Sequence, residues 1–303
     1  MPRASSRWAS HEPFVLATSP ETSSFPIVRI AADATSAEYK KGMASLQELQ
    51  ERRAYECRLT PDRALQTLDE AEEFLLDRGL LTRTPDSALP SLFEACHEEP
   101  YAARRGGFAS WPATKWPWFG DLQERDGVYR LNVHRGKNVL VTEEVAALVD
   151  PICRSEIKRM AAEADDWALI LEHLDAAGPA LLEDLQTELA LKPKELKLTL
   201  SPLELCGAVV RRTVVLETAG GGHQHTSELA RWDQVYTKPS RHGGLEDLIV
   251  AAVRAAVVAP EREVLRWFSW TWNRRKENRV ERLVDEGRLE RPEPGWVTAP
   301  ASA

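Results

Sequence analysis

The sequence predicts a mainly α-helical protein with small β-hairpins, that is, an α+β fold. Between residues 165 and 189, apolar residues recur at helical spacing on two successive segments. A β-branched run at residues 213–216 is followed by three glycines and a second extended segment that ends at Trp232. Helix, helix, helix and hairpin within about seventy residues is the order of a winged helix-turn-helix. We therefore expect tandem units of this kind.

The central winged helix is predicted to span residues 163–242. Its second helix covers residues 181–189 and ends before Lys192-Pro193. Its third helix covers residues 202–210, because Ser201 can cap it and proline fits the first helical position. Its first helix is predicted from an apolar stripe at Trp167, Ile170, Leu171 and Leu174.

Three further regions complete the predicted organisation. Residues 1–36 lack periodicity and are expected to form a disordered N-terminal extension. Residues 37–162 are expected to form an N-terminal winged-helix-like and aromatic-rich region. Residues 243–303 are expected to form a C-terminal winged-helix-like unit with a short tail.

Helices and strands of the N-terminal region follow from caps, glycines and alternation. We expect a helix at 37–58, and a second from Thr60-Pro61-Asp62 to Gly79, followed by a strand at 80–83. The basic turn His134-Arg135-Gly136-Lys137 should join strands at 128–133 and 139–141. A helix that ends near Asp150-Pro151 should precede a separate helix at 154–163.

The C-terminal unit is predicted from the same signals. Helices are expected at 245–258 and 260–268, and Asn273 can cap another that ends at Asp285. Residues 288–291 and 296–298 should form a second small wing. Residues 72–83, 281–291 and 209–216 share a junction between helix and extended chain, which indicates a unit used three times.

Composition sets the bounds on function. The chain has 303 residues with 43% hydrophobic and 28% charged, and it lacks the run of about 18 apolar residues that a membrane span needs. The four cysteines are widely spaced, which indicates reduced thiols in a cytoplasmic protein. A net charge of −8 argues against nucleic-acid binding by the whole surface. Locally, residues 192–241 carry eight basic and five acidic residues, so a basic face remains available.

The third helix and wing of the central unit are the first candidate for nucleic-acid contact. Arg211 and Arg212 are expected to leave that helix, and His223 and His225 flank the wing glycines. In a winged helix the third helix enters the major groove and the wing touches the backbone. The alternative is a core-facing helix with solvated arginines. Two histidines without a third ligand predict no metal site.

A second candidate is the basic run Arg274, Arg275 and Lys276. Three cations in the first turn of a helix oppose its dipole, and a phosphate would remove that conflict. The alternative is a solvated face paired with nearby glutamates.

A third candidate combines Trp111, Lys115, Trp116 and Trp118 with Arg135 and Lys137 of the basic turn. Aromatic faces beside cations can stack unpaired bases, whereas clustered tryptophans more often form core. The two turn cations are candidate phosphate contacts.

The sequence resembles the winged-helix crosslink-repair DNA glycosylases of the AlkZ type over roughly residues 60–299. The resemblance rests on these motifs: Leu89-Pro90-Ser91-Leu92-Phe93, Trp116-Pro117-Trp118, the 134–137 turn, Gly178-Pro179, Arg266-Trp267-Phe268 and Glu286-Gly287-Arg288-Leu289. It implies tandem winged helices that form a concave DNA-binding surface and remove alkylated bases. The family positions the attacking water with Gln-x-Gln or Gln-x-Asp, and this chain contains neither motif.

Three hypotheses follow. The leading one is a cytoplasmic protein, nucleoid-associated if bacterial, that binds double-stranded DNA without a metal or small-molecule cofactor and without established catalysis. The second is an active glycosylase with a non-standard acid or base, for which Glu94 and His134 are the candidates. The third is a protein-interaction module, which the acidic total favours.

Overall fold

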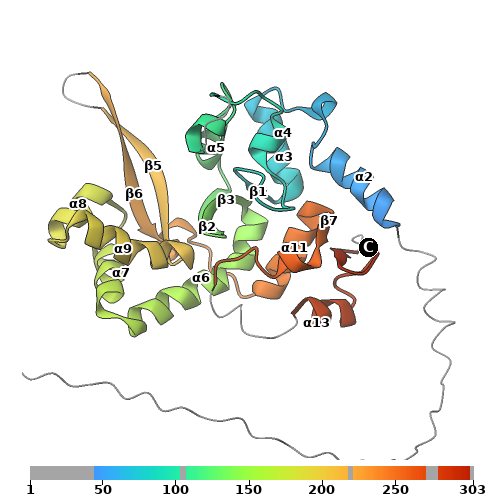
Figure 1. Ribbon diagram of the computed structural model, residues 1–303. Helices are drawn as coiled ribbons and strands as arrows, with labels where there is room; N and C mark the ends of the chain where they lie inside the picture. Colours follow the sequence, from blue (N-terminus) through green and yellow to red (C-terminus); the bar gives the residue numbers. More distant parts are fainter. Residues whose placement is uncertain (1–43, 103–106, 218–220, 271–278, 301–303) are drawn as a thin grey trace, which may run out of the picture. The chain divides into compact units, whose positions relative to one another are not determined.

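Helices and short strands follow the same order three times along the described chain. A helix leads to a short strand, further helices follow, and the chain returns through two extended segments. In each unit, the second of these two extended segments lies in the middle of the sheet. It pairs with the short first strand on one side and with the first extended segment on the other. The predicted α+β class is therefore confirmed, and the strand order is that of winged-helix units. The computed structural model (Figure 1) describes residues 44–102, 107–217, 221–270 and 279–300.

The first unit follows helix α2 (Leu46–Glu56), which begins at a capping box between Ser45 and Glu48. Its sheet has the order β1-β3-β2. Its elements are α3 (Leu68–Arg78), β1 (Leu80–Thr82), α4 (Leu92–Ala95), α5 (Trp118–Gln123), β2 (Val128–His134) and β3 (Lys137–Thr142), with 3-10 turns at Pro61–Arg63 and Gly107–Ser110.

The predicted helix from Thr60 to Gly79 was wrong at its start. Only Pro61–Arg63 is helical there, and α3 begins seven residues after Pro61. Thr67 caps α3 by accepting from the Glu70 amide at 3.1 Å, and the Leu65 amide donates to the Ala95 carbonyl at 2.9 Å. That long-range bond holds the intervening chain extended. The end at Gly79, with φ +77°, was predicted correctly.

The long helix α6 (Glu143–Glu163) leads from the first unit into the second. The sequence predicts two helices separated at Asp150-Pro151, and this was wrong because α6 runs through the proline. Pro151 removes one backbone donor, yet Val149 and Ile152 on either side are buried and hold both halves in the core. The Leu148 carbonyl, one turn earlier, accepts from the Gly244 amide at 3.0 Å.

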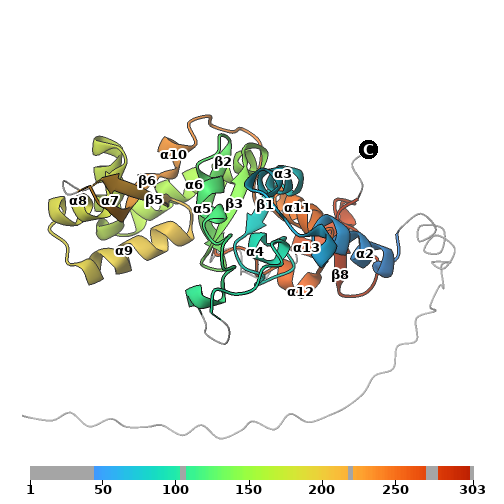
Figure 2. The same cartoon turned by 90° about the horizontal axis from the view of Figure 1, so that it is seen from above.

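The second unit contains the longest hairpin. Its elements are α7 (Asp165–Ala177), β4 (Ala180–Leu181), α8 (Leu182–Glu188), α9 (Pro193–Leu205), β5 (Val209–Glu217) and β6 (His223–Arg231). The hairpin of β5 and β6 extends beyond the helices in Figure 1, and α7, α8 and α9 gather around its base in Figure 2. Helix α10 (Trp232–Val235) then returns the chain to α6.

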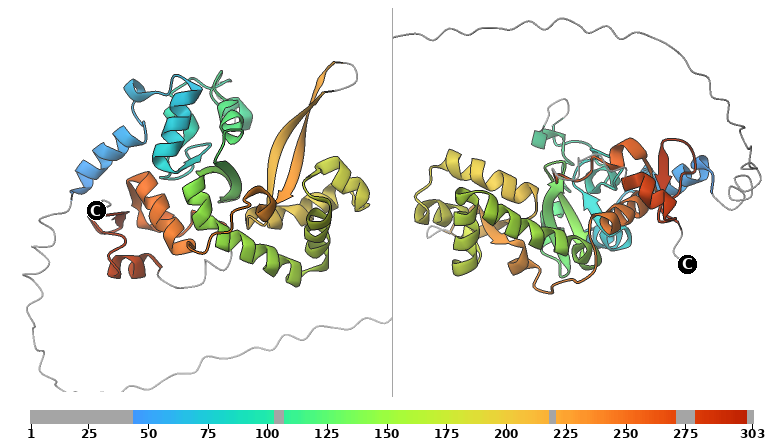
Figure 3. Two further views of the ribbon diagram at one scale, coloured as in Figure 1. Left: turned by 180° about the vertical axis from the view of Figure 1, so that it is seen from behind. Right: turned by 90° about the horizontal axis from the view of Figure 1, so that it is seen from below.

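The third unit packs on α6 through α11 (Leu245–Ala256), as the view from behind shows (Figure 3). Helix α12 (Glu261–Val264) is shorter than predicted, and α13 (Arg279–Asp285) completes the described helices. The predicted small wing is reduced to one bridge between Glu290 and Thr298. The main partner of β8 (Trp296–Thr298) is instead β7 (Val258–Pro260), a strand that the sequence did not reveal.

The three predicted junctions are not equivalent. Gly79 follows the first helix of its unit, whereas Gly207 and Gly287 follow the third helix of theirs. Gly207 has φ +77°, and an added Cβ would lie 2.6 Å from Cys153 Sγ. That close approach fixes the third helix of the second unit against α6.

Asp150 joins these elements through a buried carboxylate on α6. Its two oxygens accept from Arg154 Nε at 2.8 and 3.0 Å, from Trp232 Nε1 at 2.8 Å and from the Ser240 amide at 2.8 Å. Arg154 also donates to the Tyr236 carbonyl at 2.7 Å. One carboxylate therefore holds α6, α10 and the segment that leads to α11.

Replacement of Asp150 tests this role. Asp150→Asn keeps the size of the side chain but leaves Arg154 without its counter-charge. We expect the free energy of unfolding to fall by about 3 kcal/mol, because breaking a buried pair from one side leaves an uncompensated charge. Urea denaturation measures it. The exposed Asp126→Asn is the control, and equal stability of the two variants would contradict the role of Asp150.

Candidate nucleic-acid interface

Three lysines lie on the exposed start of α9, the third helix of the second unit. Lys192, Lys194 and Lys197 are exposed, whereas Leu196, Leu200 and Leu203 of the same helix are buried. Residues 194 and 197 are one turn apart and therefore share a face. The first turn of the third helix thus presents cations to solvent, on the element that reads the major groove in DNA-binding winged helices.

The predicted start of this helix, Pro202, lies nine residues after the observed start, Pro193. Ser201 and Pro202, predicted to begin it, lie in its last turns. The helix begins at Pro193 because the Glu195 carboxylate accepts from the Lys192 amide at 3.1 Å and proline fits the first helical position. Lys192-Pro193 carries the signal for this start, but the same pair also predicts the end of the preceding helix.

The wing is exposed over its outer half. His223 and His225, two predicted contacts, are exposed there on β6. Val215 and Leu216 on β5 are 54% and 39% exposed. At the base of the hairpin, Leu229 and Ala230 join the core. The outer half is therefore a surface available for contact.

Arg211 and Arg212 lie on β5 rather than at a helix end, which corrects their predicted position. Arg211 Nε donates to Glu204 Oε1 of α9 at 2.6 Å, and Arg212 Nε donates to Glu228 Oε2 on the facing strand at 2.5 Å. Both pairs connect neighbouring elements, so each arginine already has a counter-charge within the chain. Their contact with nucleic acid remains a prediction.

The basic turn between β2 and β3 forms as predicted, with φ +50° at Arg135 and +72° at Gly136. Arg135 Nη1 donates to the Asp86 carbonyl at 2.6 Å. Lys137 Nζ lies 2.5 Å from Asp86 Oδ1. These two predicted phosphate contacts thus hold the turn against the loop before α4. The second candidate, the basic run Arg274, Arg275 and Lys276, lies outside the described residues.

The aromatic segment divides between core and surface. Trp111 and Trp118 pack against the first-unit core, and Lys115 Nζ donates to the Leu65 carbonyl at 2.7 Å. Trp116 is 41% exposed and contacts Phe108 edge-on at a ring distance of 5.2 Å. The tryptophans therefore have different roles, and Lys115 is engaged by the backbone.

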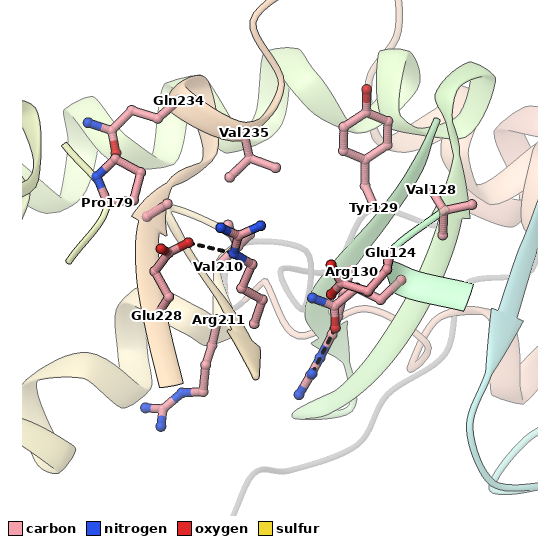
Figure 4. Close-up of a pocket in the computed structure, with 13 residues that line it drawn as sticks. Glu124, Val128, Tyr129, Arg130, Pro179, Val210, Arg211, Glu228, Gln234 and Val235 are labelled. Carbon is pink, nitrogen blue, oxygen red and sulfur yellow. Dashed lines mark hydrogen bonds and ion pairs between the residues drawn. The ribbon is translucent and has the colours of Figure 1, made fainter. Parts of the chain in front are cut away.

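A cavity of about 340 Å³ lies between β2 of the first unit and β5 of the second. Arg130 enters from β2 and Arg211 from β5, on opposite sides of it (Figure 4). A smaller cavity of about 160 Å³ shares Arg130, Val210 and Arg211, and adds Asn132, Asn138 and Glu204. Arg130 is not among the site residues predicted from the sequence. Its alternation with Asn132 and His134 along one strand, polar on every second residue, was the available signal.

The two candidate catalytic residues have different surroundings. Glu94 is half-buried on α4, and its charge adds to the burial that raises the pKa of Cys57 to about 11. His134 is 1% exposed, and its Nε2 lies 3.3 Å from Ser87 Oγ. Burial and the Arg135 cation lower the pKa of His134 to about 4, against the Trp267 carbonyl and Asp86. The imidazole is therefore neutral at pH 7, so it is not an imidazolium that could act there as a general acid.

Acid should destabilise the protein through His134. The unfolded imidazole binds a proton near pH 6.5 and the folded one only near pH 4. Stability is fully present above pH 6.5 and is lost as the pH falls toward 4, by about 3 kcal/mol. We expect His134→Gln to lose less stability than the wild type between pH 7 and pH 4.5 in urea titrations. The exposed His242→Gln should keep the wild-type slope. Parallel curves for wild type and His134→Gln would refute this assignment.

Comparisons with known proteins give one structural match. No protein-family model matches the chain, and no curated protein matches it. The solved structure of the Streptomyces sahachiroi DNA glycosylase AlkZ is similar with a TM-score of 0.48 and 11% identity, over 84% of this chain and 70% of that chain. None of the helices in the described ranges has the length and apolar character that a bilayer span requires.

Proposed function

We propose that the protein binds double-stranded DNA through the second unit, with the start of α9 in the major groove and the β5–β6 hairpin on the backbone. The observation that carries this proposal is the exposed lysine face of α9. Lys192, Lys194 and Lys197 stand on the third helix of a winged-helix topology, beside one acidic residue, Glu195. Cations in this position can contact phosphates and base edges.

The distribution of charge supports the second unit, rather than the first, as the part of the chain that binds DNA. The corresponding third helix of the first unit, α5, has the sequence Trp-Phe-Gly-Asp-Leu-Gln and carries no cation. The whole chain has a charge of −8, so much of its remaining surface repels phosphate. DNA should therefore be oriented by the few cations of α9 and the wing.

Salt dependence measures the proposed contacts. We expect the wild type to bind a fluorescent duplex with an affinity that falls steeply with salt, because bound phosphates release counterions. Lys194→Ala combined with Lys197→Ala should lower the slope of log K against log salt by about two and weaken binding about tenfold or more. Fluorescence anisotropy at several salt concentrations gives both quantities.

Lys158→Ala is the matched control, since Lys158 is an exposed lysine on α6 away from the proposed interface. It should leave the slope unchanged. Equal slopes for the wild type and the double variant, or no binding at low salt, would overturn the proposal. Loss of DNA binding together with a partner captured through Val215 and Leu216 would instead select the protein-interaction alternative. Release of a modified base from the duplex would establish the glycosylase alternative.

A further inference from the structure

Arg130 is a largely buried guanidinium that has neutral partners. Its Nε donates to Asn138 Oδ1 at 3.0 Å, and its Nη1 donates to Gln123 Oε1 at 3.0 Å. No carboxylate forms an ion pair with it within the described ranges of the chain. These two bonds use two of the five N–H groups of the guanidinium, so three remain for another acceptor.

The surroundings of Arg130 carry excess positive charge. Burial, Arg83 and Arg211 together lower the pKa of Arg130 to about 10, and only Glu204 acts in the opposite direction. Glu204 is already paired with Arg211 through a 2.6 Å contact. In the cavity of about 160 Å³, Arg130 and Arg211 thus face one carboxylate, that of Glu204. A buried charge without a counter-charge is costly, and an anion in this place would offset the cost.

Space and polar groups for an anion are present at the same point. The cavity of about 160 Å³ is lined by Arg130, Arg211, Asn132 and Asn138. Asn132 Oδ1 is buried without a hydrogen-bond partner. If the Asn132 side-chain amide is rotated by about 180°, its NH₂ group takes the place of that oxygen and can donate to an anion. Arg130, Val210 and Arg211 also line the neighbouring cavity of about 340 Å³, which is where a group attached to the anion would lie.

We propose that this cavity binds one phosphate group, held by the free N–H groups of Arg130 and by Asn132. A phosphate offers several acceptor oxygens in tetrahedral arrangement, which suits the donors of Arg130 and Asn132, two alternate residues of β2. Its source is either the backbone of a nucleic acid or a free nucleotide. The inference stands on Arg130 and its cavity, and it is independent of the lysines of α9.

Inorganic phosphate is the first probe. We expect 10 mM phosphate to raise the Tm of the full chain by about 2–4 °C over sodium chloride of equal ionic strength, because a ligand that binds only the folded state stabilises it. Arg130→Met should abolish this shift. In chloride alone the variant should melt at or above the wild-type Tm, since the uncompensated cation is gone. Differential scanning calorimetry records both effects.

Two variants make the result specific. Arg262→Met removes an exposed arginine of α12 and should keep the full phosphate shift. Arg130→Lys keeps the charge but loses the planar donor fork, so it should keep only part of the shift. It also covers the case in which Arg130→Met does not fold. The proposal fails if phosphate gives the wild type no shift beyond chloride, or if wild type, Arg130→Met and Arg130→Lys shift equally.

The source of the phosphate follows from two further arms, a nucleoside 5′-monophosphate and a short duplex. If Arg130→Met loses the phosphate-induced rise in Tm and also binds the duplex more weakly, the ligand is a phosphate of the nucleic-acid backbone. Loss of the shift with unchanged duplex binding and lost nucleotide binding indicates a free nucleotide. The Lys194→Ala and Lys197→Ala variant keeps the inorganic-phosphate shift in either case. A wild type with that shift but no affinity for any duplex would refute the proposed DNA binding and retain this site.

Discussion

The arrangement of the described chain depends on the hydrogen bonds and the ion pair made by the Asp150 carboxylate. This carboxylate is buried on α6, and it accepts from α6 itself, from the Trp232 indole and from the backbone of Ser240. These donors come from the helix that leaves the first unit, from the helix that ends the second, and from the segment that enters the third. Because a lone buried charge is unfavourable, all three must be in place together. The stacked rings of Trp232 and Tyr236, 5.5 Å apart, pack on the same junction.

This junction also sets the geometry of the proposed phosphate site. The cavity around Arg130 has one wall on β2 and the other on β5, strands of two different sheets. Its width therefore depends on how α6 holds the second unit on the first. The lysine face of α9 and the exposed wing belong entirely to the second unit, so they keep their geometry independently of that width. The proposed DNA contact of α9 and the proposed phosphate site of β2 thus depend on this junction to different degrees.

The sequence predicted the elements whose signals are local and missed those that long-range contacts decide. Alternation and glycine turns predicted both hairpins, and the apolar stripe from Trp167 predicted α7. The start of α9 was missed because proline ends a helix as readily as it begins one, and only the Glu195 contact to the Lys192 amide resolves the choice. Continuity of α6 through Pro151 depends on its burial and on tertiary contacts. Arg130 was overlooked because a strand arginine is usually solvated, and its neutral partners become visible only in three dimensions.

The hydrogen bond from the Gly244 amide to the Leu148 carbonyl has a consequence for dynamics. An added Cβ at the adjacent Gly243 would lie 2.7 Å from Leu148 Cα, so this chain crossing is tight. The Gly244 amide lies at the helix start, outside the ladder of α11, and is bonded only across the crossing. Its hydrogen-exchange rate should therefore report separation of α11 from α6 rather than fraying of either helix. Hydrogen exchange at the Gly244 amide thus measures how often the third unit separates from α6.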